Sequence, residues 1–591
     1  MKRRRQRDDE FDPFGSALGP EQDDYSIYPG GTRLGEILVD LQLVHPQHIV
    51  AVLAEHEPGE HKPLGRRLVE RGIIGEYDIA RAVAHRFSLE LVDLGAITPD
   101  PAATKLLDEP TARSMVAIPL QATNDRVFVA VAVPSDRSIA ALQRAIGRPV
   151  VVKVAAHSDI LAAIASSYRA LTGVSSQIRA FEAQQAKRDD AEATPEISTV
   201  SEDAPVVQVV QRIITQALRD RASDIHIEPQ TGRVRVRYRI DGALHDVLEL
   251  PVAMGPALSS RIKILANMNI VERRRAQDGQ ISMEVDGRSV DIRVATTGVI
   301  EGEKVVMRLL DKSRSLYRLD QLGMPDDMIA IYAELLRTPY GMVICAGPTG
   351  SGKTTTLYGS LGEINSPERN VMTIEDPVEY RIQSINQIQI NEQAGITFAT
   401  GLRSILRLDP DVILVGEIRD AETARIAVQS ALTGHFVLSS LHATDAPAAL
   451  HRLLDMGIES FLIASSVTAV VAQRLVRRIC THCRAPYEPP RDERAFLSSI
   501  RVQPPMGGFL RGYGCNFCAQ TGYLERIGVY ELMLVSDAIR DLVVDRATHE
   551  EMRKVARSEG MRTLGEEAAR LVEAGVTTIA EVVRSIYAVG G

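Results

Sequence analysis

The fold of the largest part of this 591-residue chain is decided by residues 346–356, "AGPTGSGKTTT". Residues 347–354 match the pattern G-x-x-x-x-G-K-[ST], which is typical of a loop that wraps phosphate groups with its backbone N–H groups. The loop follows an apolar run, "GMVICAG", and opens a helical pattern, "KTTTLYGSLGEI", as a phosphate loop requires. This context favours a nucleotide site over an accidental glycine-rich turn, and the expected binding residues are Gly347, Pro348, Thr349, Gly350, Ser351, Gly352, Lys353, Thr354 and Thr355.

Two residues of the loop have predictable roles toward ATP and Mg²⁺. Lys353 is expected to reach the β- and γ-phosphate oxygens, and the Thr354 hydroxyl is expected to ligate Mg²⁺. Apolar strands alternate with helical patterns on both sides of the loop. This alternation predicts a parallel sheet that is covered on both faces.

Carboxylates flank two of the apolar strands. In "DPDVILVGEIRD", Asp411 precedes an apolar strand and Glu417 ends it, close to a Walker B arrangement, while "TIEDPVEY" supplies Glu375, Asp376 and Glu379. Strand ends line the ligand crevice of such a sheet, so one acid should polarise the attacking water and another should hold Mg²⁺ through water. We favour Glu379 and Glu417 as the catalytic pair. The alternative is that some of these acids are helix caps or surface charge.

Two further polar patterns leave their role open. His435 and His442 follow just downstream of the acids, a position that favours function over a purely structural role. In residues 233–239, apolar residues alternate with four arginines, which predicts a half-buried antiparallel strand. The arginine row is either a solvated face or an anion-facing surface.

Composition narrows the function classes. The formal net charge is −9, so the chain is a poor candidate for wrapping nucleic acid over its whole surface. No apolar stretch follows the basic start, and no apolar run reaches the length of a membrane span. We therefore expect a cytosolic protein whose first 30 residues form a disordered basic tail.

Four of the five cysteines form a C-x₂-C-x₃₁-C-x₂-C pattern: Cys480, Cys483, Cys515 and Cys518. The two C-x₂-C pairs together offer four thiolates, which suit a tetrahedral, structural Zn²⁺ site. An iron–sulfur cluster or unmetallated thiols are the alternatives. The fifth cysteine, Cys345, lies in an apolar run and is predicted to be a small core residue.

The remaining sequence divides into further units. An internal echo at an offset of 30 residues, "RLGEILVDLQLV" and "PLGRRLVERGII", predicts two helix–turn–helix halves. Alternating strand and helix patterns follow to residue 173, with Ser158 as the expected N-cap of the last helix. The expected domains are a tail 1–30, an N-terminal domain 31–173 with the echo at 31–90, a linker 174–204 that is partly helical at its start, a second domain 205–312, a linker 313–325, and a nucleotide domain 326–591 with a metal subdomain 474–530 and C-terminal helices 535–591.

Taken together, these motifs resemble the ATPases of type II secretion and type IV pilus assembly, the secretion-superfamily hexamers. The resemblance covers residues 31–591 and is carried by "SDIHIEP", "VRVRYRIDG", "RRRAQDGQI", "TIEDPVE", "LRSILRLDPDVILVGEIRD", "TGH", "LHATDA", "TGYLERIGVYEL", the phosphate loop and the paired cysteines. It implies an α/β multidomain protein. The expected parts are a helical plus small α/β N-terminal domain, a PAS-like α+β middle domain, and a RecA-like P-loop ATPase domain with a tetracysteine zinc subdomain and C-terminal helices.

The resemblance also implies roles for individual residues. Glu379 would be the catalytic base, Glu417 the Walker B acid, and His442 part of a histidine box near the γ-phosphate. The implied arginines are Arg293 and Arg308, which would reach the phosphates from the preceding domain, and Arg403 and Arg407, which would act at the nucleotide interface. The strand arginines 233–239 then become better candidates for interface residues than for phosphate ligands.

The implied assembly is a homohexamer at the inner face of the cytoplasmic membrane, held by a docking protein and acting on an inner-membrane platform protein. The echo resembles a tandem module that binds cyclic-di-GMP, but it departs from that pattern at Gln42, His56, Pro63 and Arg86. The echo therefore predicts either cyclic-di-GMP binding or a docking domain for a membrane-anchored partner. Two other functions remain open: a DNA-uptake or conjugation ATPase, and a regulatory binding module whose hydrolysis is incidental.

Overall fold

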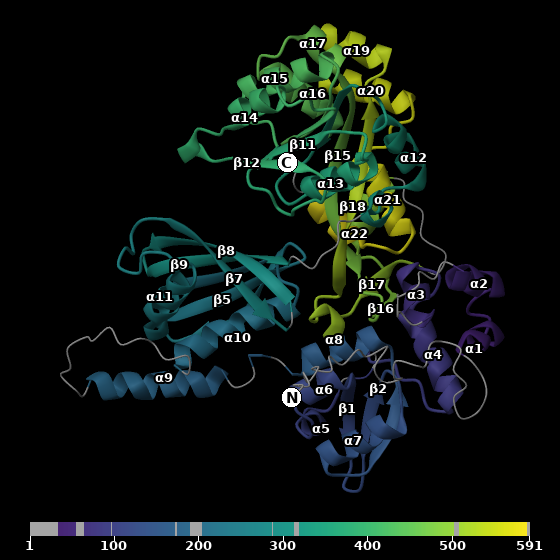
Figure 1. The fold of residues 1–591 in the computed structure, drawn as a ribbon, viewed down its shortest axis with the longest axis vertical. Helices are drawn as coiled ribbons and strands as arrows, with labels where there is room; N and C mark the ends of the chain where they lie inside the picture. Colours follow the sequence, from purple (N-terminus) through teal and green to yellow (C-terminus); the bar gives the residue numbers. More distant parts are fainter. Residues whose placement is uncertain are drawn as a thin grey trace, which may run out of the picture.

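The computed structural model (Figure 1) describes residues 34–587 except for 55–63, 96, 98, 169, 172–173, 190–203, 287, 312–317 and 501–507. The predicted tail 1–30 and two departures from the cyclic-di-GMP pattern, His56 and Pro63, lie outside the described residues. Among the described helices, none combines the length and the apolar character needed to cross a membrane.

The sequence echo folds as two helix pairs, which confirms the predicted helical halves. The helices are α1 (Leu34–Asp40), α2 (Pro46–Ala54), α3 (Leu64–Glu70) and α4 (Glu76–Phe87). A Cβ atom at Gly35 would lie 3.4 Å from Leu64, and one at Gly65 would lie 3.7 Å from Leu34. The equivalent glycine of each half therefore packs against the equivalent leucine of the other, around one small apolar core.

A small α/β unit follows. Its sheet has the order β1-β2-β3, with β1 (Ala117–Ala122) antiparallel and β3 (Val150–Val154) parallel to β2 (Val127–Val131). Its helices are α5 (Pro101–Thr104), α6 (Glu109–Ser114), α7 (Asp136–Ile146) and α8 (His157–Ser167). The prediction of Ser158 as the N-cap of α8 is wrong, because the N-cap is Ala156. The N–H of Ser158 instead donates to Glu76 of α4 at 2.7 Å, so a carboxylate from another helix caps α8.

The middle domain is a six-stranded antiparallel sheet in the order β6-β5-β4-β9-β8-β7. The strands are β4 (Asp224–Gln230), β5 (Arg233–Ile240), β6 (Ala243–Leu250), β7 (Gln277–Val285), β8 (Arg288–Val299) and β9 (Gly302–Asp311). Helices α9 (Val174–Asp189), α10 (Pro205–Arg219) and α11 (Gly255–Leu265) accompany it, with the 3₁₀ turn η2 (Val252–Met254). Helix α9 confirms the predicted helical start of the linker, and its Val174 is buried in this domain's core.

The arginine row on β5 is balanced by carboxylates of the same domain. The apolar residues of β5 are buried and its arginines are exposed or half-buried, as predicted. The ion pairs are Arg233 with Glu249, Arg235 with Asp246, Arg237 with Glu228 and Arg239 with Asp224. These contacts neutralise the row within the domain.

The nucleotide domain contains a seven-stranded sheet in the order β12-β11-β13-β14-β10-β15-β18. The strands are β10 (Gly341–Ala346), β11 (Val371–Glu375), β12 (Asn386–Gln389), β13 (Val412–Val415), β14 (Phe436–Leu441), β15 (Val467–Ile479) and β18 (Tyr523–Leu534). All neighbours are parallel except β18, which is antiparallel to β15 at the edge. Residues of β10 enter apolar cores on alternate faces, which confirms a sheet covered on both sides.

Helices cover this sheet on both faces (Figure 1). They are α12 (Asp326–Leu335), α13 (Lys353–Ile364), α14 (Phe398–Ile405), α15 (Ala421–Leu432), α16 (Ala446–Asp455), α17 (Ser460–Ser466), α19 (Asp537–Val544), α20 (His549–Ser558), α21 (Leu564–Glu573) and α22 (Ile579–Val582), with η3 (Leu319–Leu322), η4 (Glu392–Ala394) and η6 (Val583–Tyr587). Leu319 and Met324, which fall in the expected linker 313–325, are buried in this domain's core.

The subdomain between β15 and β18 contains a second, two-stranded sheet. Its elements are β16 (Arg484–Pro486), α18 (Arg491–Ile500), β17 (Leu510–Gly512) and η5 (Asn516–Cys518). Strands β16 and β17 pair antiparallel and lie at the end of the nucleotide domain that is nearest to α8 in Figure 1. This subdomain carries all four cysteines of the predicted metal site.

Candidate active site and four-cysteine centre

Four neighbouring parallel strands end at one edge of the seven-stranded sheet and carry the predicted site residues. The phosphate loop follows β10, Glu375 ends β11 with Asp376 and Glu379 just after it, Glu417 follows β13, and His442 follows β14. Strands β13 and β14 pair in register, as do β14 and β10. The sheet therefore gathers residues that are almost a hundred positions apart in the sequence along one crevice.

The phosphate loop closes onto the start of α13. Lys353 Nζ donates to the carbonyl oxygens of Gly347 at 2.9 Å and of Pro348 at 3.1 Å, and burial lowers the pKa of its ammonium group. The side chains of Thr354 and Thr355 are exposed at the first turn of the helix. Gly352 has φ of 90°, a backbone conformation that other residues rarely adopt. The loop thus offers N–H groups, a lysine and free hydroxyls to a phosphate chain and its Mg²⁺.

Glu417 and His442 are in contact across the ends of β13 and β14. His442 Nε2 lies 3.5 Å from Glu417 Oε2. Arg419 forms an ion pair with Glu417, and this hydrogen bond raises the pKa of the Arg419 guanidinium. Arg419 also lies 3.7 Å from Asp376 at the end of β11. The Glu417 carboxylate therefore lies beside His442, and Arg419, which the sequence analysis had not singled out, joins them.

Glu379 meets an arginine from the middle domain. Arg293 Nη2 lies 3.2 Å from Glu379 Oε2, and the two side chains are 32% and 29% exposed. Arg293 comes from β8 and Glu379 from the segment between β11 and β12. The predicted base and one predicted arginine are therefore brought together at the boundary of two domains.

The other three predicted arginines are not brought to the phosphate loop within this chain. Arg308 pairs with Asp224 at 3.0 Å inside the middle domain. Arg403 of α14 pairs with Glu422 of α15, and Arg407 lies 3.4 Å from the Ser404 hydroxyl. Arg403 and Arg407 are on the surface, and their action at a nucleotide site remains a prediction that involves a second subunit.

Several candidate side chains have a structural role. Glu375 is buried and accepts hydrogen bonds from Tyr358 and Thr373, so it is held away from solvent. His435 Nδ1 bonds the carbonyl oxygen of Ser430 at 3.0 Å, which fixes the turn before β14. Two histidines follow these acids in the sequence. Among the described residues, only His442 of the two contacts one of the acids, Glu417.

Gln473 is a buried contact of the phosphate loop that the sequence analysis missed. Its Oε1 accepts a hydrogen bond from the Thr356 hydroxyl at 2.8 Å and lies 3.5 Å from the Cys345 sulfur. A Cβ atom at position 352 would lie 2.8 Å from Gln473 Nε2, so the loop packs closely on β15. The available signal was a polar residue in the apolar run "VTAVVAQRL", where burial demands a partner. Cys345 is buried and burial raises the pKa of its thiol to about 12, which confirms a core role.

The four predicted metal ligands are gathered at one point. All four sulfur atoms lie within 4.8 Å of one another. The Cys480–Cys515 and Cys515–Cys518 sulfur pairs are 3.7 Å apart, and the Cys483–Cys518 pair is 3.9 Å apart. Zinc–sulfur bonds of about 2.3 Å in a tetrahedron place sulfur atoms about 3.8 Å apart, so the donor set fits Zn²⁺.

The environment of Cys518 also suits a thiolate. A hydrogen bond with the Cys480 thiol holds the pKa of the Cys518 thiol well below its ordinary value. The backbone N–H groups of Cys515 and Gly522 both donate to the Cys518 sulfur at 3.2 Å. Metal binding requires deprotonated cysteines, and these donors stabilise the negative charge that a bound Zn²⁺ would share.

The chain is similar in sequence to a family of known proteins. The model described as Type II/IV secretion system protein matches residues 199–584, and the MshEN domain model matches residues 87–174. The type II secretion system protein HxcR of Pseudomonas aeruginosa is 48% identical over 396 residues, covering 67% of this chain and 80% of HxcR. The type IV pilus assembly ATPase PilB of Myxococcus xanthus is 38% identical over 559 residues, covering 93% of this chain and 98% of PilB. The crystal structure of the pilus retraction motor PilT with bound ADP covers 64% of this chain and 96% of PilT, at 25% identity and a TM-score of 0.43.

The chain belongs to the type II/IV secretion ATPase family. The family confirms the expected ATP hydrolase, its use of ATP and Mg²⁺, and the multidomain α/β fold. The MshEN match begins at residue 87, within the last turn of α4, so it covers the small α/β unit and leaves the helical repeat outside.

Proposed function

We propose that this secretion ATPase is a cytoplasmic motor whose ATP hydrolysis drives assembly of a type IV pilus or of a type II secretion pseudopilus at the inner membrane. The contact between Glu379 and Arg293 is the main support. In this proposal the contact joins the base on one domain to a cation for the phosphates on another. Because a charge delivered by a second domain stabilises the transition state only when the domains are correctly placed, hydrolysis becomes dependent on domain motion.

The chemistry follows from the residues that surround the crevice. Glu379 accepts the proton of the attacking water, and the phosphate-loop N–H groups and Lys353 hold the β- and γ-phosphates. Thr354 and Glu417 are the residues that would hold Mg²⁺, which would neutralise charge on the phosphates. His442, next to Glu417, senses the γ-phosphate.

A homohexamer completes the proposed site. Arg403 and Arg407 are exposed, and their side chains contact Glu422 and Ser404. In a ring, a neighbouring copy would bring such surface arginines to the next nucleotide. The zinc subdomain would act as a rigid arm toward an inner-membrane platform protein, and the N-terminal region would bind a membrane-anchored docking protein. We infer a peripheral position at the inner face of the cytoplasmic membrane, held by these partners.

The variant Lys353→Ala tests the motor function. ATPase activity of the purified full chain should fall to background, and pilus or secretion output in cells should be lost with it. Lys554→Ala, which removes an exposed lysine of α20, is the matched control and should keep both. Loss of hydrolysis with output intact would reject the motor.

Two alternatives have their own discriminating measurements. Stimulation of ATPase activity by DNA would favour a DNA-uptake or conjugation ATPase, although the acidic balance of the chain argues against it. Titration with cyclic-di-GMP tests whether the helical repeat α1–α4 is a second-messenger site or a docking domain. Binding that the purified full chain shows, and that changes its ATPase rate, would favour the regulatory interpretation.

A further inference from the structure

The four-cysteine centre contacts the N-terminal α/β unit through two aromatic rings. His482 lies between Cys480 and Cys483, and Phe517 lies between Cys515 and Cys518. Their rings stack with centroids 4.1 Å apart and an interplanar angle of 25°. Phe517 packs against the apolar core of the N-terminal unit, and η5 lies against α8. Each cysteine pair therefore presents one ring at this boundary.

The approach of the two domains is close enough to require a glycine. A Cβ atom at Gly95, in the N-terminal unit, would lie 2.9 Å from His482 Cβ and 3.0 Å from its Nδ1. Contacts of this length do not occur for real side chains, so any other residue at position 95 would push His482 away. The middle domain reaches the same point, where Arg221 Nη2 lies 3.5 Å from the carbonyl oxygen of Phe517.

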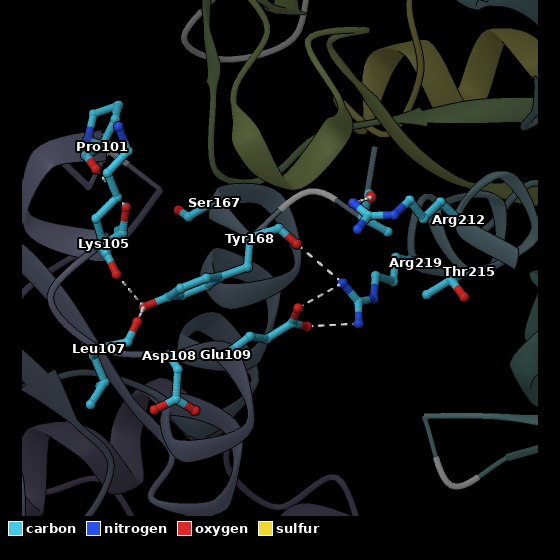
Figure 2. A pocket seen from close by; sticks show the side chains of 12 residues that line it. Pro101, Lys105, Leu107, Asp108, Glu109, Ser167, Tyr168, Arg212, Thr215 and Arg219 are labelled. Atoms are coloured by element: carbon cyan, nitrogen blue, oxygen red, sulfur yellow. Dashed lines mark hydrogen bonds and ion pairs between the residues drawn. The ribbon is translucent and has the colours of Figure 1, made fainter. Parts of the chain in front are cut away.

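A second contact, separate from the cysteines, ties the N-terminal unit to the middle domain (Figure 2). Arg219 at the end of α10 lies 2.7 Å from Glu109 and donates to the carbonyl oxygen of Tyr168 at 3.1 Å. The same guanidinium pairs with Asp286 at 2.9 Å. Beside it lies a cavity of about 730 Å³, lined by α5 and α6 on one side and α10 on the other. This boundary is therefore joined through a few polar contacts and is not packed throughout.

The cysteine centre is also connected to the phosphate loop. Strand β15 carries Gln473, which bonds Thr356 behind the loop, and ends at Ile479, directly before Cys480. A shift of β15 would therefore move both the phosphate loop and the Cys480–Cys483 pair. Strands are stiff elements that transmit such shifts.

We propose that the four-cysteine centre is the docking site of this chain's own N-terminal α/β unit on the motor, and that zinc holds the dock in shape. The metal would hold the Cys480–Cys483 and Cys515–Cys518 pairs together. It would thereby place His482 and Phe517 against the N-terminal unit. Loss of the metal would release the N-terminal unit from the motor while the unit itself stays folded. This inference rests on the zinc site of the proposed function but does not depend on the transported substrate.

Hydrogen–deuterium exchange on the full chain tests the inference through the amides of α8, residues 157–167. The test variant is Gly95→Leu, which obstructs the dock without removing a sulfur. The control is Gly362→Leu, at an exposed position of α13 outside the dock, where a Cβ atom meets no atom within 4 Å. Zinc content is measured for each protein, and wild type is also examined after zinc is removed with a chelator.

We expect α8 to exchange about tenfold faster in Gly95→Leu and in zinc-stripped protein, since an aromatic contact and a covered helix face are lost. The central strand β2 should keep its protection, Gly362→Leu should show wild-type α8 exchange, and both Gly95→Leu and Gly362→Leu should keep their zinc. Unchanged α8 exchange in Gly95→Leu would overturn the docking site. Unchanged α8 exchange after zinc removal would overturn the role of the metal. A wild-type protein without zinc would refute the metal site itself, while the Gly95→Leu comparison would still decide the docking.

Discussion

Replacing Arg293 with alanine separates a catalytic arginine from a structural ion pair. Arg293 Nη2 and Glu379 Oε2 are 3.2 Å apart, and both side chains are about one third exposed. Solvent screens such a pair, so its loss should cost less than about 1 kcal/mol of stability. An arginine that stabilises the charge of phosphoryl transfer contributes at least about a thousandfold to kcat, which corresponds to about 4 kcal/mol of activation free energy.

The expected result is therefore a large fall in kcat with an almost unchanged midpoint of thermal unfolding. Steady-state ATPase assays with saturating Mg²⁺ and ATP give kcat, and scanning calorimetry gives the midpoint. Arg235→Ala is the matched control, because Arg235 is a paired, partly exposed arginine of the same sheet, bound to Asp246. A kcat for Arg293→Ala within threefold of the Arg235→Ala value would refute the assignment and leave the contact as a simple ion pair.

Two further predictions concern the C-terminal part of the chain. Cys480→Ser should lose the zinc that wild type holds at about one per chain, whereas Cys345→Ala should keep it, as elemental analysis would reveal. Burial opposes ionisation of Glu581, but hydrogen bonds from Arg584 and Arg477 outweigh it and lower the pKa of this carboxyl from its ordinary value of 4.5. Its charge therefore stabilises the fold above about pH 4.5 and less as the pH falls below that value, so the unfolding midpoint of wild type should exceed that of Glu581→Gln at neutral pH and converge with it in acid. An equal difference at all pH values would contradict this reasoning.

The local pattern of the sequence determined the elements and much of the site. Strand β10, the phosphate loop and α13 follow from one continuous stretch, because apolar periodicity and glycine spacing act between near neighbours in the chain. The cysteine spacing likewise predicted a compact four-sulfur cluster. The Ser158 cap failed because Glu76, eighty-two residues earlier, supplies the carboxylate at that helix start. No local pattern encodes such a partner.

The tertiary structure alone decided which groups meet across domains. The pairing of Arg293 with Glu379, the support of the phosphate loop by Gln473, and the contact of Gly95 with His482 each join residues that are far apart in sequence. The sequence identified the residue types that phosphate and metal chemistry need. The partners of these residues depend on how separately folded units pack against one another. That packing is determined by the shape and charge of many surface residues together, so no single motif predicts it.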